Sequence, residues 1–120
     1  MKNVTLVIGA SLNSERYSNI VIKKLLDMEI QIAAIGITKG TVSGVAIETE
    51  LKHYKNIETV SLYLNPERQK LYYDYIVDLN PRRVIFNPGT ENKEFVKLLQ
   101  ANNIEHEIAC TLVLLSTNQY

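Results

Sequence analysis

Five short apolar segments rich in β-branched residues recur along the chain at nearly even spacing. They are VTLVI (4–8), IQIAAI (30–35), TVSLYL (59–64), RVIFN (83–87) and HEIA (106–109). Each interval has room for a helix, as a connection between parallel strands requires. Several segments are apolar on both alternating faces, which is typical of strands covered by helices on both sides. The spacing therefore predicts an α/β domain of three layers around a five-stranded parallel sheet.

Helical patterns fill most of the intervals. Residues 18–28 and 91–101 carry apolar side chains at helical spacing, with Ser18 and Thr90 as candidate N-caps. Asn65 followed by Pro66 predicts the start of a helix that continues to Leu79. The segment 36–58 instead predicts a partly extended crossover with one helical turn at 48–54. If the sheet is doubly wound, we expect the strand order 3-2-1-4-5 or a close relative, with any ligand at the carboxyl ends of strands 1 and 4.

Composition excludes several classes of function. Thirteen basic and thirteen acidic residues cancel over 120 residues, so no overall field attracts nucleic acid or anionic lipid. The apolar runs are far shorter than the roughly 20 residues that span a bilayer. Cys110 is the only cysteine, and the two histidines show no zinc-ligand spacing. We expect a single domain over 1–120 in the cytoplasm, without nucleic-acid or membrane partners.

The first strand ends in the loop GASLNSERYS, residues 9–18. Gly9 occupies the first glycine position of a dinucleotide fingerprint, while Ser11 and Ser14 occupy the other two. Free N–H groups and the helix dipole favour phosphate at such a turn, and Arg16 adds a guanidinium suited to phosphate oxygens. The loop indicates either a phosphate site of a different design or an ordinary strand-to-helix turn.

Two further turns lie at strand ends. After the second strand, AIGITKG has no acidic residue to bind a ribose hydroxyl, and Lys39 follows closely. A cation at this place suits a phosphorylated ribose, whereas a solvated loop lysine is the alternative. The segment IFNPGTEN (85–92) brings Gly89 to the end of the fourth strand, where it would allow a ligand close to the backbone or simply begin a helix.

Taken together and in register, these stretches resemble the small coenzyme A-binding proteins with a Rossmann-like domain. They are also similar to the N-terminal CoA-binding part of succinyl-CoA synthetase α subunits. The resemblance rests on VIGASLNSERYSNIVIKKLL, IAAIGITKGTVSG, IFNPGTEN and IACTLVLL, and it covers about residues 3 to 116. Two stretches depart from the family pattern: GIT follows strand 2 where NP is common, and FNP precedes Gly89 where an aromatic residue and Gln are common.

The resemblance implies a set of ligand-binding residues. They are Gly9, Ala10, Ser11, Arg16, Ser18, Lys39, Tyr63, Leu64, Pro88 and Gly89. Gly9, Ala10 and Ser11 would line the pyrophosphate, and Arg16 and Ser18 would add contacts to it. Lys39 would lie near the 3′-phosphate at the adenosine end of CoA. The walls of the crevice would be formed by Tyr63, Leu64, Pro88 and Gly89. Cys110 matches a family cysteine, and a small buried apolar side chain is its alternative role.

The sequence contains no arrangement of residues typical of a catalytic centre, and 120 residues leave no room for a dehydrogenase's substrate domain. We therefore expect non-catalytic binding of CoA or acyl-CoA, with a homo-oligomer or a protein partner left open. The first alternative is a sensor or regulatory module for NADP or another phosphorylated adenine nucleotide. A receiver-like interaction domain is a third, although the acidic residues that such domains need after strands 1 and 3 are missing.

Overall fold

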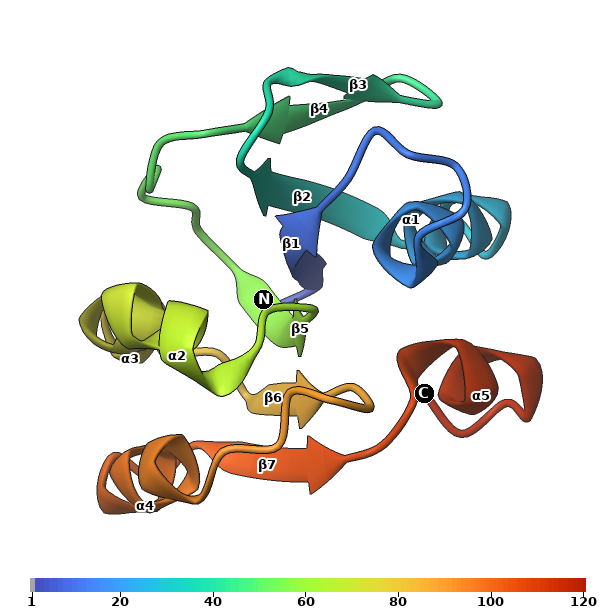
Figure 1. Ribbon diagram of the computed structural model, residues 1–120. Coiled ribbons are helices and arrows are strands. Elements are labelled where there is room, and N and C mark those ends of the chain that lie inside the picture. The colour runs from blue at the N-terminus through green and yellow to red at the C-terminus, as the bar shows by residue number, and fades with distance from the viewer. Residues whose placement is uncertain (1) are drawn as a thin grey trace.

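A twisted sheet of seven strands forms the centre of the structure, a computed structural model that describes residues 2–120 (Figure 1). The strands are β1 (Val4–Ala10), β2 (Gln31–Gly36), β3 (Gly40–Val42), β4 (Val45–Glu48), β5 (Ile57–Leu62), β6 (Arg83–Phe86) and β7 (Glu105–Ile108). The helices are α1 (Tyr17–Asp27), α2 (Pro66–Gln69), the 3₁₀ helix η1 (Lys70–Tyr72), α3 (Tyr73–Leu79), α4 (Lys93–Ala101) and α5 (Thr111–Ser116). The predicted three-layer α/β architecture is confirmed.

The sheet has seven strands where the sequence predicted five. The two additional strands, β3 and β4, form a hairpin within the segment 36–58. This segment is extended, as predicted, but residues 48–54 form no helical turn. Strand β4 pairs with β2 in parallel, through Ala34 with Ile47 and Ile35 with Glu48. Since the hairpin covers the outer edge of β2, the next long strand must pair elsewhere.

The strand order is β3-β4-β2-β1-β5-β6-β7. The predicted order, with the third long strand outside the second, is therefore wrong. Strand β5 pairs with the opposite edge of β1, because the hairpin occupies the position that the prediction gave to it. The order reverses between β1 and β5, so the ligand-binding crevice expected of such sheets lies there and not between β1 and β6.

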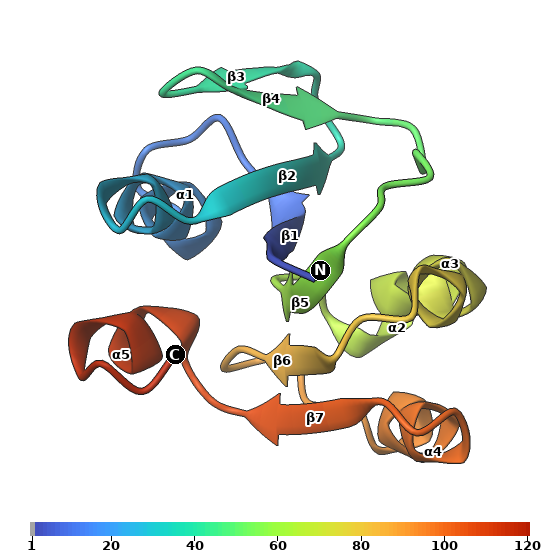
Figure 2. The same cartoon turned by 180° about the vertical axis from the view of Figure 1, so that it is seen from behind.

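Helices cover both faces of the sheet. Helices α1 and α5 lie on one face, and α2, α3 and α4 lie on the other (Figures 1 and 2). The alternation of strand β1 produces two cores. Leu6 and Ile8 pack with Phe86 and Phe95 on the second face, whereas Val7 packs with α1 on the first. Burial of each such side chain stabilises the fold by about 1.5–3 kcal/mol, which explains why β1 is apolar throughout.

The predicted helix starts have mixed outcomes. The Asn65 cap is confirmed, because its Oδ1 accepts a hydrogen bond from the Arg68 N–H at 2.9 Å. Thr90 is not the cap of α4, since Asn92 Oδ1 accepts from the Phe95 N–H at 3.1 Å. Ser18 is not a cap either, because α1 begins one residue before it, at Tyr17.

Candidate functional site

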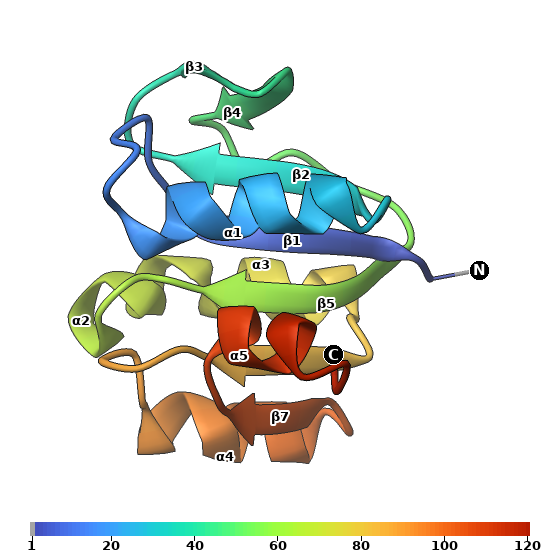
Figure 3. The ribbon, with the colours of Figure 1, turned by 90° about the vertical axis from the view of Figure 1, so that its right-hand side faces the viewer.

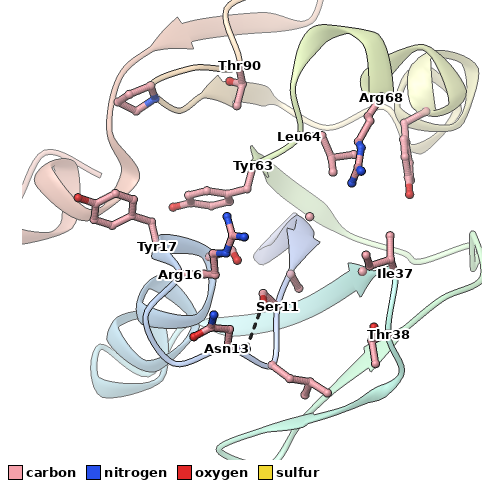
Figure 4. Close-up of a pocket in the computed structure, with 17 residues that line it drawn as sticks. Ser11, Asn13, Arg16, Tyr17, Ile37, Thr38, Tyr63, Leu64, Arg68 and Thr90 are labelled. Carbon is pink, nitrogen blue, oxygen red and sulfur yellow. Dashed lines mark hydrogen bonds between the residues drawn. The ribbon is translucent and has the colours of Figure 1, made fainter.

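The carboxyl ends of β1, β2 and β5 and the loop that follows β6 surround a cleft of about 510 Å³, shown in close-up in Figure 4. The parallel strands all point toward this end of the molecule (Figure 3). The lining residues are Gly9, Ala10, Ser11, Leu12, Asn13, Arg16, Tyr17, Ser18, Gly36, Ile37, Thr38, Tyr63, Leu64, Arg68, Tyr72, Pro88 and Thr90. The volume lies within the usual range of small-molecule sites.

Two glycines make the floor of the cleft possible. Gly9 has a φ of +92° at a bulge in β1, and a Cβ there would lie 3.0 Å from the backbone carbon of Tyr63. A Cβ on Gly36 would lie 2.3 Å from the carbonyl oxygen of Ala10. Only glycine therefore lets the ends of these strands approach one another without a backbone shift.

The loop between β1 and α1 is held by its own polar side chains. Ser11 Oγ accepts a hydrogen bond from the Asn13 N–H at 3.1 Å, and Asn13 Oδ1 accepts from the Glu15 N–H at 2.9 Å. Buried Asn19 donates through Nδ2 to the Ser11 carbonyl at 2.9 Å. These contacts fold the loop against the start of α1. That helix has no side-chain cap and no acidic residue in its first turn, so its N-terminal dipole faces the cleft without a carboxylate.

Two arginines supply the charge of the cleft. Arg16 precedes α1, and Arg68 lies in α2 on the opposite wall (Figure 4). No acidic side chain and no lysine is among the lining residues, and over residues 2–120 neither guanidinium forms a salt bridge. The cleft therefore presents two positive charges that the protein itself does not neutralise.

Tyr63 lies at the centre of the cleft, and its hydroxyl is buried without a hydrogen-bond partner in the described part of the chain. Burial raises the pKa of Tyr63 to about 12, although the Ser61 and Thr111 hydroxyls nearby oppose the shift. At neutral pH the side chain is therefore an uncharged hydrogen-bond donor. Cys110 occupies the N-cap position of α5 and is partly exposed, which differs from a fully buried apolar side chain.

The structure brings eight of the ten predicted site residues to the cleft. Lys39 and Gly89 are the two that do not line it. Lys39 is exposed on the way into β3, because β2 ends at Gly36 and the chain then turns away into the hairpin. A Cβ on Gly89 would meet no atom within 4 Å, so its positive φ of +90° and not a close approach favours glycine there.

Sequence reasoning missed nine lining residues. These are Leu12, Asn13, Tyr17, Gly36, Ile37, Thr38, Arg68, Tyr72 and Thr90. Gly36 and the two residues after it end the second strand, so the rule that ligands bind at strand ends could have found them. Arg68 gave no such signal, because it belongs to a helix whose position depends on the strand order.

Residues 2–120 show no sign of a metal site or of a helix that spans a membrane. These residues contain no cluster of three or more histidine, cysteine, aspartate or glutamate side chains that could hold a metal ion. Within the same range, no helix is both long and apolar enough to cross a membrane. The cleft at the strand ends is therefore the candidate functional site.

The mostly parallel sheet, the order reversal beside β1 and the cleft above it define a Rossmann-like α/β domain. Comparison with known families then identifies the group, because the model of the CoA binding domain matches residues 3–116. This chain belongs to the CoA-binding domain family.

Solved structures agree with the assignment of the fold. An uncharacterized protein, 40% identical, superposes with a TM-score of 0.96 over 100% of this chain and 99% of its own. A hypothetical protein from Pyrococcus horikoshii OT3 is 27% identical, with a TM-score of 0.78 over 91% of this chain and 76% of its own. The structure of cell-free ID.343 from Thermus thermophilus, 17% identical, gives a TM-score of 0.85 over 99% and 91%. No curated protein matches the sequence.

Proposed function

We propose that this protein binds coenzyme A or an acyl-CoA in the cleft and does not transform it. The observation that carries the proposal is the charge of the lining, which has two arginines without a salt bridge among residues 2–120 and no acidic residue. CoA carries a pyrophosphate and a separate ribose phosphate, and arginine binds both kinds of group through bidentate hydrogen bonds. Membership of the CoA-binding domain family supports the same ligand class.

The end of β2 supports a ligand with a phosphorylated ribose over NAD. In NAD-binding domains an acidic residue near this position accepts hydrogen bonds from the ribose hydroxyls. Here Gly36, Ile37 and Thr38 line the cleft instead. A ribose bound at this place would meet no carboxylate that could repel a phosphate group.

The chemistry of the lining favours binding without catalysis. It contains no histidine, cysteine, aspartate, glutamate or lysine, so the hydroxyls of Ser11 and Ser18 have no general base in the lining to activate them as nucleophiles. The buried hydroxyl of Tyr63 is a weaker acid than an ordinary tyrosine, because burial raises its pKa to about 12. We therefore assign the lining residues to recognition and orientation of the ligand.

The experiment is a comparison of thermal stabilisation by CoA, acetyl-CoA and NADP. At a concentration a hundred times its Kd, CoA should stabilise the fold by about 2.7 kcal/mol, which raises the Tm by several degrees. NADP should give little or no shift. A shift with NADP and none with CoA would support a nucleotide sensor in place of a CoA-binding protein. Conversion of acetyl-CoA during incubation, followed by mass spectrometry, would contradict non-catalytic binding.

A further inference from the structure

We propose, on the basis of the proposed CoA binding, that Arg68 binds the 3′-phosphate of the ligand and makes the cleft selective for ribose that carries a phosphate. The sequence assigned this contact to Lys39, which does not line the cleft. Arg68 is the one remaining cation of the lining once Arg16 is placed beside the first loop. The two residues after β2 that line the cleft, Ile37 and Thr38, carry no charge that could replace that of Lys39.

The two arginines are suited to two different phosphate groups. Arg16 immediately precedes α1, next to the loop and the helix start that favour a pyrophosphate. Arg68 reaches in from the opposite wall, near Leu64 and on the side of the cleft where Ile37 lies (Figure 4). A ligand with a single phosphate cluster would engage one wall only. A ligand whose phosphates are separated, as in CoA, can engage both.

The surroundings of Arg68 fit the adenosine end of the ligand. Ile37 is 80% exposed although it is apolar, and it lines the same cleft as Leu64 and Tyr72. An exposed apolar side chain at the mouth of a cleft is a suitable contact for the flat face of a base. The base and the phosphorylated ribose would then lie together at this side, with the guanidinium of Arg68 beside the phosphate.

The backbone that carries Arg68 is fixed even though α2 has only four residues. The neighbouring side chain of Gln69 is fully buried and donates to the carbonyl oxygens of Leu64 at 2.8 Å and Thr90 at 2.7 Å. Asn92 in turn donates through Nδ2 to Gln69 Oε1 at 2.9 Å. This network ties α2 to the turn after β6, so Arg68 is presented to the cleft from a rigid support.

The acidic residue next to Arg68 in the sequence is paired with another side chain. Glu67, its neighbour in α2, forms a salt bridge with Lys70 at 3.3 Å. The guanidinium of Arg68 has no salt bridge in the described part of the chain. An unpaired and exposed arginine on a fixed helix can bind a phosphate without first breaking an internal ion pair.

The test compares CoA with dephospho-CoA, which lacks only the 3′-phosphate, on the full chain and its variants by isothermal titration calorimetry. The unaltered protein should bind CoA about tenfold or more tightly than dephospho-CoA, as expected for a hydrogen-bonded charge pair. Arg68→Ala should reduce the affinity for CoA to that for dephospho-CoA and leave dephospho-CoA binding unchanged. Arg68→Lys should keep part of the preference.

Arg16→Ala is the matched control, because it should weaken both ligands equally and preserve their ratio. Circular dichroism and urea unfolding should show that each variant is folded. A preference for CoA that persists in Arg68→Ala, or equal binding of the two ligands by the unaltered protein, would overturn the assignment of Arg68 alone. Failure of the unaltered protein to bind either ligand would reject the proposed function and this assignment with it.

Discussion

The four arginines of this chain lie at opposite ends of the parallel strands and have opposite surroundings. At the amino end of β6, Arg82 binds Glu58 and Glu105, and buried Arg83 binds Glu107 at 3.2 Å. At the carboxyl ends, Arg16 and Arg68 line the cleft and have no acidic partner among residues 2–120.

The difference shows that arginines at one end of the sheet stabilise the fold, whereas those at the other end are available to bind a ligand. Arg83 is 4% exposed, donates through Nε to Thr59 Oγ1 at 2.9 Å and lies over the ring of Tyr120 at 4.5 Å. A buried guanidinium needs such partners, because an unpaired charge is costly away from water. The arginines of the cleft keep water and therefore need none. Their hydrogen-bonding capacity remains available to a ligand.

The largest expected effect is on the free energy of unfolding, at the end of the sheet where the arginines form ion pairs. Arg83→Met leaves the buried hydroxyl of Thr59 without its donor and removes the contacts with Glu107 and Tyr120, so the free energy of unfolding should fall by about 2–3 kcal/mol. The affinity of the folded protein for CoA should stay within twofold, because the change lies at the far end of the strands. Urea unfolding and calorimetry measure the two quantities.

Arg82→Met is the control for this prediction. Its side chain is 49% exposed and its ion pairs are in contact with water, so we expect a loss below about 1 kcal/mol. Equal losses for the two variants would show that burial does not decide the contribution of these arginines. If folded Arg83→Met protein bound CoA more weakly, the two ends of the sheet would not have separate roles in stability and binding.

An intermediate effect is expected at the cleft, where a substitution should change the affinity for CoA and not the free energy of unfolding. Arg16→Ala should lower the affinity for CoA by about 10- to 100-fold, which corresponds to a lost hydrogen bond between charged groups. Its free energy of unfolding should change by less than about 0.5 kcal/mol, because Arg16 is exposed and forms no salt bridge within the described residues.

Lys39→Ala is the matched control, since it removes a nearby exposed cation that does not line the cleft. It should change the affinity for CoA by less than twofold. Equal weakening by Arg16→Ala and Lys39→Ala would indicate attraction by overall charge and not a defined phosphate site.

The spacing of apolar segments was sufficient to predict the layers and the five long parallel strands, because strands buried on both faces leave a strong pattern. Most of the loop after β1 was also predictable, since a glycine at a strand end and an arginine before a helix are local features. Five of the eight predicted residues that line the cleft belong to this loop, and the resemblance to the family implied all eight.

The order of the strands could not be predicted from the same local patterns. The hairpin of β3 and β4 is short, and its pairing with the outer edge of β2 involves only Ala34 and Ile35 of that strand. That pairing places β5 beside β1 and brings α2, with Arg68, to the cleft. The sequence therefore indicated Lys39 as a phosphate contact, whereas the structure places Arg68 and not Lys39 at the cleft.

Two tyrosines extend the comparison of paired and unpaired groups to uncharged side chains. Tyr75 donates its hydroxyl hydrogen bond to the carbonyl oxygen of Lys52 at 2.6 Å, whereas the buried hydroxyl of Tyr63 has no partner in the described structure. At pH 7, Tyr75→Phe should therefore cost about 1 kcal/mol of stability. Tyr63→Phe should change stability by less than that, because it removes a buried polar atom that gains no hydrogen bond from folding.

The ionisation of Tyr63 has no effect on stability at neutral pH and becomes measurable only in alkaline solution. Burial raises its pKa to about 12 in the folded protein, compared with about 10 when the chain is unfolded. The folded state therefore holds the phenolic proton more tightly, so this contribution to stability is complete below pH 10 and is lost as the pH rises through 12. Tyr63→Phe should lose less stability than the unaltered protein between pH 10 and pH 12, as measured by urea unfolding at several pH values. Parallel stability curves for the two proteins over this range would show that the hydroxyl of Tyr63 is not the buried, unpartnered group described at the cleft.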